Sequence, residues 1–347
     1  MKALVVCAGG GVGDVLLATP VMRALRGRYD EVVALTTPAH APVLDGNPDL
    51  AQVWSSEGGV ATLARRIAGA RFDAAVVTWA TLRSALLPAL AHIPVRVGQA
   101  RRLYSPLFTR RVVVRSERGD RTTHWTQILL DFARAIECDV ADASPVFVLD
   151  EAARRAAADV LAAAGLAEPF VLLHPTRGIT AQRRWPTEGL GRLGQALRAR
   201  LGGAVVVTGS AVDRAVAGDI ASRCGGISLA GETSLPVFAA IAARARCVVA
   251  MDSGPMHLAA AVGAPTVGIF ALQSDEPDRW APLGPRTATV RADYPCPPQH
   301  RKETCPDFAC VRELDVAAIV AAAQRLLLAP DSHAHESKAP RRATDCV

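Results

Sequence analysis

The sequence is poor in aromatic residues and contains no membrane-spanning apolar run, and both absences narrow its possible functions. Phe, Trp and Tyr make up 5% of the 347 residues, so we expect no base-stacking surface for nucleic acid. The longest uncharged window, Ser253 to Ser274, is long enough to cross a bilayer but includes His257, Gly263 and Pro265. It fits a helix, a turn and a strand better, and we therefore expect no transmembrane segment.

Three cofactor signatures are also missing. In the Gly-rich turn that follows the first apolar run, Leu16 stands where a dinucleotide fingerprint has its third glycine. The next predicted strand ends in Leu35-Thr36-Thr37-Pro38, without the acidic residue that would hold a ribose. The Walker pattern and the D-x-D motif are absent as well.

The eight cysteines are scattered and show no disulfide framework. Several fall inside predicted strands, which indicates buried thiols in a reducing compartment. The apolar run at the N-terminus is too short for a signal peptide and is interrupted by glycines. These features favour a cytoplasmic protein.

Half of the residues are apolar, and short apolar runs alternate with helical segments along the whole chain. This alternation predicts parallel, doubly wound sheets. We expect strands at 2–8, 31–37, 51–55, 73–79 and 95–98, and again at 170–174, 204–208, 227–229, 247–250 and 266–270. We expect a first domain at 1–165, a second at 166–312, a C-terminal helix at 313–329 and a disordered tail at 330–347.

The stretch from Arg246 to Phe270 is the clearest candidate for a binding site. An apolar run ends at Asp252-Ser253-Gly254-Pro255 and is followed by small helix formers. Asp252 or Ser253 can cap the helix, Pro255 suits its first turn, and the exposed amides favour a phosphate. His257 lies within the first helical turn. The alternative is a plain helix cap with a buried core histidine.

Three further turns carry polar residues of the same kind. Asp14 follows the first strand and is either a carboxylate facing a cleft or a residue that stabilises the helix dipole. Arg183 and Arg184 suit diphosphate oxygens, unless they belong to a basic loop above a packed Trp185. Asp213 can bond a ribose or cap its own helix. At the capped helix start at 231–236, the backbone can lie along the edge of a nucleotide base.

The positive charge is concentrated between Arg96 and Arg121, where eight arginines face only Glu117 and Asp120. Such a stretch favours an anionic partner, either nucleic acid, an anionic lipid or a phosphorylated glycan, or else forms a solvated loop face. No nucleic-acid-binding signature accompanies it.

The order of these motifs resembles glycosyltransferase family 9, the heptosyltransferases of lipopolysaccharide core assembly. The most specific parts are GDVLLATPVMRALR, from Gly13 to Arg26, and MDSGPMHLAAAVGAPTVGIF, from Met251 to Phe270. The resemblance implies a GT-B fold, in which two Rossmann-like, doubly wound domains face each other across a cleft. It also implies that the second domain holds a nucleotide sugar and that the C-terminal helix crosses back to the first domain.

For the function, the resemblance implies inverting, metal-independent transfer of heptose from ADP-heptose to an anionic glycolipid, the lipopolysaccharide inner core. Asp14 would be the catalytic base, and no cofactor or metal would be needed. The enzyme would be cytoplasmic and would work at the inner face of the cytoplasmic membrane. The acceptor would be bound by Gly13, Arg101 and Arg102. The donor would be bound by Thr176, Arg183, Asp213, Thr233, Asp252, Ser253, Gly254 and His257.

Two departures from the family pattern leave the donor open. Arg183 stands where members commonly carry lysine, and Asp213 where a longer Glu is usual. A relative that uses another nucleotide sugar, or that modifies a protein or small natural product, is therefore an alternative, as is a non-catalytic nucleotide-sugar-binding protein. Near the C-terminus, Cys296, His300, Cys305 and Cys310 form either a Cys₃His metal site or a structural thiol cluster.

Overall fold

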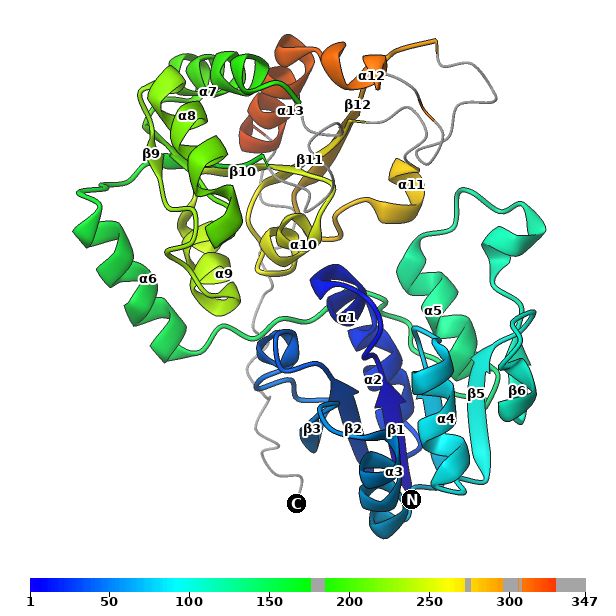
Figure 1. The fold of residues 1–347 in the computed structure, drawn as a ribbon. Coiled ribbons are helices and arrows are strands. Elements are labelled where there is room, and N and C mark those ends of the chain that lie inside the picture. Colours follow the sequence, from blue (N-terminus) through cyan, green and yellow to red (C-terminus); the bar gives the residue numbers. More distant parts are fainter. Residues whose placement is uncertain (176–184, 272–275, 296–304, 306–307, 329–347) are drawn as a thin grey trace, which may run out of the picture.

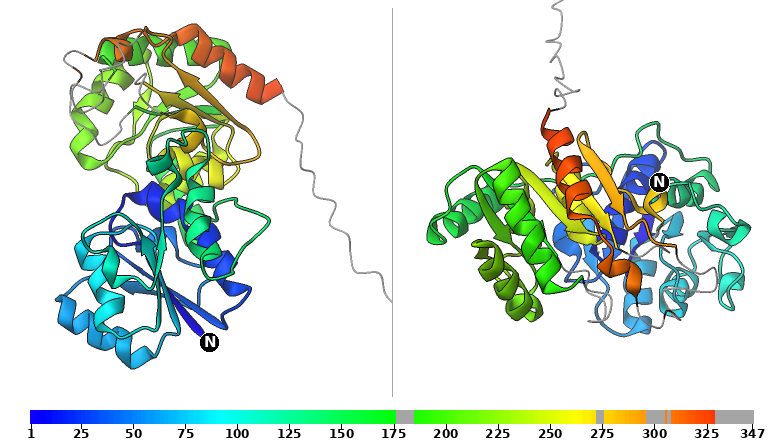
Figure 2. Two further views of the ribbon diagram at one scale, coloured as in Figure 1. Left: turned by 90° about the vertical axis from the view of Figure 1, so that its right-hand side faces the viewer. Right: turned by 90° about the horizontal axis from the view of Figure 1, so that it is seen from above.

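The computed structural model describes residues 1–175, 185–271, 276–295, 305 and 308–328. Within them the chain forms two six-stranded sheets in which every pair of neighbouring strands is parallel. Helices cover both faces of each sheet, and the two resulting domains stack one above the other (Figures 1 and 2).

The first sheet has the order β3-β2-β1-β4-β5-β6. Its strands are β1 (Lys2–Val6), β2 (Glu31–Thr36), β3 (Gln52–Ser55), β4 (Ala74–Val77), β5 (Val95–Gln99) and β6 (Arg110–Val112). Ala3 and Val5 pack toward α1 (Val12–Leu17), α2 (Thr19–Arg26) and α5 (Trp125–Arg134). Leu4 and Val6 pack toward α3 (Val60–Ala70) and α4 (Leu82–Leu90) on the opposite face. Burial on both faces explains why these strands are continuously apolar.

The second sheet has the order β12-β11-β10-β7-β8-β9. Its strands are β7 (Phe170–His174), β8 (Ala204–Val207), β9 (Ile227–Ser228), β10 (Cys247–Met251), β11 (Thr266–Phe270) and β12 (Thr287–Arg291). One face is covered by α7 (Thr187–Leu201), α8 (Arg214–Cys224) and α13 (Val316–Leu328), and the other by α9 (Leu235–Arg244) and α10 (Gly254–Ala261). The short helices are α11 (Pro277–Trp280) and α12 (Ala309–Arg312).

Both sheets therefore have the same doubly wound order, because β7 to β12 repeat the arrangement of β1 to β6. In such a sheet the chain reverses its winding direction beside the first strand, and ligands bind at the carboxyl ends of the strands there. These positions lie between β1 and β4 in the first domain and between β7 and β10 in the second.

Two helices lie in a different domain from the one expected. The helix α6 (Glu151–Ala163), placed in the first domain by the expected boundary at 165, packs against α9 of the second domain (Figure 1). Its buried face is Ala153, Ala157 and Leu161. The last helix, expected to cross back to the first domain, instead packs against α7, β11 and β12. Ile319 and Val320 of this helix cover the outer face of the second sheet. The expected tail at 330–347 lies outside the described residues.

Cys7, Cys138, Cys224 and Cys247 are buried free thiols, and Cys310 is buried as well. Within the described ranges no group of three His, Cys, Asp or Glu side chains has a metal-binding arrangement. The Cys₃His hypothesis itself depends on Cys296 and His300, which lie outside those ranges. Among the helices that the structure describes, none is both long and apolar enough to cross a membrane.

Candidate active site

One cavity of about 520 Å³ lies between the two domains, at the carboxyl ends of β1, β4 and β10. The first domain contributes the loop and helix start at 11–14 and the side chain of Trp79. The second contributes Asp252, Ser253, Gly254 and His257. The structure therefore brings the predicted base, Asp14, together with four of the predicted donor residues, although more than two hundred positions separate them in sequence.

Asp14 is held by the glycine-rich loop that precedes α1. The backbone N–H of Gly11 donates to its Oδ2 at 2.7 Å. A side chain at Gly10 would collide with this carboxylate, since an added Cβ would lie 2.5 Å from Oδ2. Burial raises the pKa of Asp14, while the Gly11 N–H and the nearby His40 act in the opposite direction. A carboxylate in this environment is a stronger base than one in water.

The start of α10 forms the opposite wall. Ser253 occupies the N-cap position in an extended conformation, but its hydroxyl donates to the carbonyl of Met251 at 2.8 Å instead of capping the helix. The positive end of the α10 dipole and its first amides are thus available to an anion.

Two glycines allow the domains to approach closely at this point. A Cβ at Gly254 would lie 2.8 Å from the Cβ of Val12 and 3.1 Å from the backbone N of Gly13. A Cβ at Gly13 would lie 3.3 Å from the Cδ2 of His257. Gly13, predicted to bind the acceptor, is therefore placed at the contact between α1 and α10.

His257 is 4% exposed, and burial lowers its pKa to about 3, so the ring is neutral at physiological pH. Its Nδ1 has no hydrogen-bond partner among the described residues. Because a buried polar atom without a partner is costly, a ligand oxygen or hydroxyl in the cavity would satisfy it.

A second cavity of about 670 Å³ continues from the first around the start of α10 and shares Val12, Ser253 and Gly254 with it. It contains the predicted donor residues Asp213 and Thr233. The Oδ2 of Asp213 accepts hydrogen bonds from the backbone N–H and the hydroxyl of Ser210, at 3.0 and 2.5 Å. These bonds form the capping box of the 3₁₀ turn Ala211–Asp213, and the Asp213 side chain makes no capping bond to α8 itself. Thr176 and Arg183 fall in the range 176–184, outside the described residues.

His174, at the end of β7, also lines this second cavity and was not singled out from the sequence. Its Nδ1 is 3.0 Å from the hydroxyl of Thr208, and its ring meets Phe238 edge to face at 5.7 Å. Burial lowers the pKa of His174 to about 4. The cavity is lined by more apolar than polar side chains, which suits the base and ribose of a nucleotide.

The two arginines predicted to bind the acceptor lie apart from Asp14. Arg102 lines a third cavity of about 340 Å³ and pairs with Glu117 at 2.9 Å. Arg101 is exposed and donates to the carbonyl of Glu117 at 3.3 Å. Neither residue lines the Asp14 cavity.

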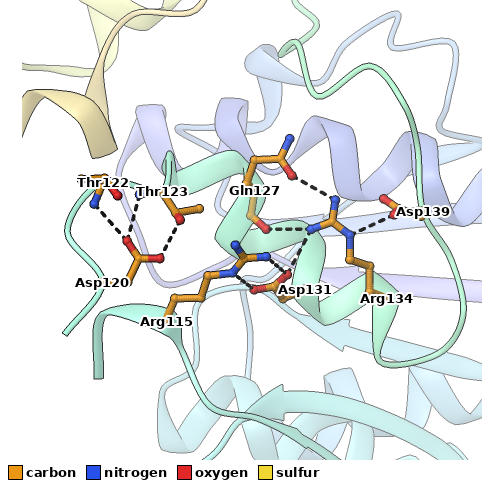
Figure 3. A network of polar contacts seen from close by, with 8 residues as sticks. All are labelled: Arg115, Asp120, Thr122, Thr123, Gln127, Asp131, Arg134 and Asp139. Atoms are coloured by element: carbon orange, nitrogen blue, oxygen red, sulfur yellow. Dashed lines mark hydrogen bonds and ion pairs between the residues drawn. The ribbon is translucent and has the colours of Figure 1, made fainter. Parts of the chain in front are cut away.

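Part of the basic stretch serves to fix its own loop. Arg115 makes two bonds to Asp131 of α5, at 2.6 and 2.7 Å, and Arg134 binds the same carboxylate at 3.1 Å (Figure 3). Asp120 accepts from the backbone N–H groups of Thr122 and Thr123, both at 2.9 Å. These contacts hold the segment before α5 in place, so only some of the arginines are available to a partner.

Four polar or aromatic side chains of the Asp14 cavity were missed by the sequence analysis: Trp79, Glu276, Arg279 and Trp280. Trp79 follows β4, next to β1 in the sheet, and its position after a strand was a usable signal. The other three belong to or adjoin α11, a four-residue helix with no apolar periodicity to reveal it.

Comparison with known proteins gives a consistent result. The family model for glycosyltransferase family 9 (heptosyltransferase) matches residues 60–307. Lipopolysaccharide heptosyltransferase 2 of Salmonella typhimurium is 26% identical over 311 residues, which are 84% of this chain and 88% of that protein.

Solved structures show the same fold. A glycosyltransferase family 9 protein from Veillonella parvula superposes with a TM-score of 0.78 at 19% identity, covering 94% of this chain and 97% of that one. The ADP-heptose lipopolysaccharide heptosyltransferase II of E. coli gives 0.76 at 23% identity, covering 94% and 99%. The expected GT-B fold of two Rossmann-like domains is confirmed. The matched family model covers most of the chain, which therefore belongs to glycosyltransferase family 9 and is a glycosyltransferase.

Proposed function

We propose that this enzyme transfers L-glycero-D-manno-heptose from ADP-heptose to a sugar hydroxyl of the lipopolysaccharide inner core, with inversion at the anomeric carbon and without a metal ion. The observation that carries the proposal is the single cavity lined by Asp14 on one side and by the start of α10 on the other. The lipopolysaccharide heptosyltransferases among its relatives support this choice of substrates.

In the proposed reaction, the Asp14 carboxylate removes the proton of the acceptor hydroxyl as the hydroxyl oxygen attacks the anomeric carbon. The bond from that carbon to the diphosphate breaks on the opposite face, and ADP leaves with the bonding electrons. Burial supports this role of Asp14, because it raises the pKa of the carboxyl group and so makes the carboxylate a stronger base. Transfer by a single direct displacement inverts the configuration.

The leaving diphosphate would lie at the start of α10, where helix amides stabilise the charge that develops on it. Neutral His257 would contact the donor through Nδ1, the atom that lacks a protein partner. Ribose and adenine would occupy the second cavity near Thr233 and Phe238. Arg183 and Thr176 belong to the same proposed donor site, and the absence of a D-x-D motif favours charge neutralisation by arginine and helix dipole over a divalent cation.

The acceptor would be an anionic glycolipid, approached from the cytoplasmic face of the inner membrane. Arg111 and Arg118 are exposed members of the basic stretch and are suited to the phosphates of such a lipid. This part of the proposal rests on charge and on the relatives' substrates.

A donor panel tests the proposal directly. Purified protein should release ADP from ADP-heptose in the presence of deacylated inner core, and should release little UDP or GDP from the corresponding nucleotide sugars. Mass spectrometry should find one added heptose on the acceptor. Turnover with a uridine or guanosine donor in preference to ADP-heptose would contradict the donor assignment.

A further inference from the structure

Three of the five tryptophans of this aromatic-poor chain gather at one side of the catalytic cavity. Trp79 follows β4, Trp125 begins α5 and Trp280 ends α11. The ring centroids of Trp79 and Trp125 are 6.4 Å apart at an interplanar angle of 64°, and those of Trp125 and Trp280 are 5.0 Å apart at 31°. The reaction proposed above uses none of them.

Trp79 is the wall shared by two cavities. It lines the Asp14 cavity and also the third cavity, and it remains 37% exposed. Its ring sits directly against Gly9, where any side chain would overlap it. The indole is thus fixed on the same glycine-rich loop that holds Asp14, with its exposed surface available to a ligand.

The third cavity has the chemistry of a hydroxyl-binding site. The Oε1 of Glu117 accepts from the side chains of Gln99 and Arg102, each at 2.9 Å. The second oxygen, Oε2, is buried and has no partner among the described residues. A carboxylate that is paired with Arg102 and has one oxygen without a hydrogen-bond partner accepts hydrogen bonds from hydroxyl groups well. Its negative charge disfavours contact with a phosphate.

We infer that Trp79 and Glu117 form an acceptor subsite for an uncharged, hydroxyl-rich sugar ring of the acceptor glycan, which stacks on Trp79 and donates hydroxyl hydrogen bonds to Glu117, while the neighbouring sugar, on the other side of Trp79, presents the reacting hydroxyl to Asp14. The inference deepens the proposed function and rests on it, since it takes the acceptor to be a glycan. The apolar C–H face of a pyranose packs on the electron-rich face of an indole. At about 340 Å³ the third cavity is near the lower end of the roughly 300–1,000 Å³ typical of small-ligand sites.

This subsite separates two kinds of recognition. The third cavity binds the neutral hydroxyl groups of the acceptor. The acceptor's anionic groups remain outside this cavity, near exposed arginines. Arg102, expected to bind the acceptor's charge, would instead orient Glu117. Removal of the acceptor's phosphates should then leave binding in the subsite intact.

The test measures binding of deacylated core oligosaccharide, with and without enzymatic removal of its phosphates, by isothermal titration calorimetry in the presence of ADP. The dephosphorylated oligosaccharide should bind the wild-type protein. Its affinity should fall about tenfold in Trp79→Ala and in Glu117→Gln, consistent with loss of one aromatic or charge-assisted contact. Trp79→Phe keeps a flat ring and should lie between wild type and Trp79→Ala. ADP affinity should be unchanged in all three variants.

Trp54→Phe and Glu57→Gln are matched controls, because neither residue lines the described cavities. Both should bind the oligosaccharide as the wild type does. Unchanged affinity in Trp79→Ala and Glu117→Gln would overturn the inference, as would binding of only the phosphorylated oligosaccharide. Failure to bind ADP while the oligosaccharide still binds through Trp79 would contradict the proposed donor and leave the sugar subsite standing.

Discussion

Asp14 is the residue in which stability and reactivity oppose each other most directly. Its pKa is raised because burial penalises the carboxylate, so the folded protein binds a proton there more tightly than the unfolded chain. By linkage, stability is lost as pH rises from the unfolded pKa through the folded one. The ionised base that the proposed reaction requires at Asp14 would therefore be maintained at a cost in folding free energy.

Asp14→Asn should separate these two effects. The amide keeps the size of the side chain but cannot take a proton, so transfer should fall by about 10²- to 10⁴-fold, the usual contribution of a general base. ADP affinity should change little. Thermal or denaturant unfolding should show a more stable variant at pH 7, and the difference should vanish below pH 3.8, where both side chains are neutral. A variant that is less stable than wild type at pH 7 would contradict the burial argument.

The buried histidine His174 should make the protein less stable in acid. Its folded pKa of about 4 lies below the ordinary value of 6.5, so the unfolded chain binds more protons between these two values. Stability from this residue is complete above pH 6.5 and is lost as pH falls toward 4. In His174→Asn, the slope of unfolding free energy against pH over this window should decrease, and His40, His124 and His257, whose pKa values are also lowered, should supply the remainder.

The control for that measurement is His92→Asn, since His92 is exposed. Its slope should match that of the wild type. An unchanged slope in His174→Asn would mean that this histidine does not titrate with folding.

At the scale of elements, the contact between α1 and α10 lies at the wall of the Asp14 cavity and helps to set its width. The two helices begin on facing loops, and only glycine at 13 and 254 lets them meet without a side chain between them. The separation of Asp14 from the proposed donor site therefore depends on the absence of a Cβ atom at both positions.

Gly254→Ala should push the helices apart, because its Cβ would lie 2.8 Å from Val12 and 3.1 Å from backbone. A shift of about 1 Å at a reacting centre costs roughly 10²-fold in rate, and we expect a loss of that order in kcat/KM. Gly218→Ala is the matched control: it lies within α8 with nothing near its Cβ, so it should be active and about 0.5–1 kcal/mol more stable. Full activity of Gly254→Ala would show that the contact can yield without consequence.

The sequence predicts the central elements well and the peripheral ones poorly, for physical reasons. Strands such as β1 and β10 are buried on both faces and so read as apolar runs. The edge strands β6, which contains Arg110 and Arg111, and β12 lack that pattern and were not predicted. The helical segment from Val12 to Arg26 is divided at Ala18 into α1 and α2, because Pro20 in the first turn of α2 has no N–H to continue the helical hydrogen bonds.

The residues of the candidate site also divide into those that the sequence predicts and those that it does not. Asp14 and the turn at 252–257 were predictable because each follows a buried strand and begins a helix. Glu117 and Trp280 become neighbours of the site only through packing, since no local pattern connects the 3₁₀ helix Arg115–Arg118 with α11. The domain to which α6 and α13 attach is likewise decided by tertiary burial.

At the scale of the whole molecule, the domain arrangement seen in Figure 2 depends on several contacts among the described residues, of which two adjoin the Asp14 cavity. One is the glycine contact between α1 and α10. The other joins the segment before α5 to α11: Arg279 donates to the carbonyl of Asp120, Trp125 packs on Trp280, and His124 reaches Ala281. The network around Asp131 and Asp120 keeps the first-domain side of this second contact rigid (Figure 3).

His124 performs two tasks through its two ring nitrogens. The backbone N–H of Thr126 donates to Nδ1 at 3.2 Å, which caps α5. Since the carbonyl of Ala281 can only accept, Nε2 carries the hydrogen and donates to it across the domains at 2.9 Å. Burial lowers the pKa of His124, which favours the neutral ring that both bonds require.

His124→Asn should retain the cap and lose the bond between domains, because asparagine is a good N-cap residue but is too short to reach Ala281. Loss of one neutral hydrogen bond, about 0.5–1.5 kcal/mol, should shift the balance between closed and open arrangements by about 2- to 10-fold. Small-angle scattering should then report a larger radius of gyration, and the KM for the donor should rise while the stability of the first domain is kept. The exposed His92→Asn should change neither quantity. Scattering and KM that match the wild type in His124→Asn would mean that the bond from His124 to Ala281 does not help to set the domain arrangement.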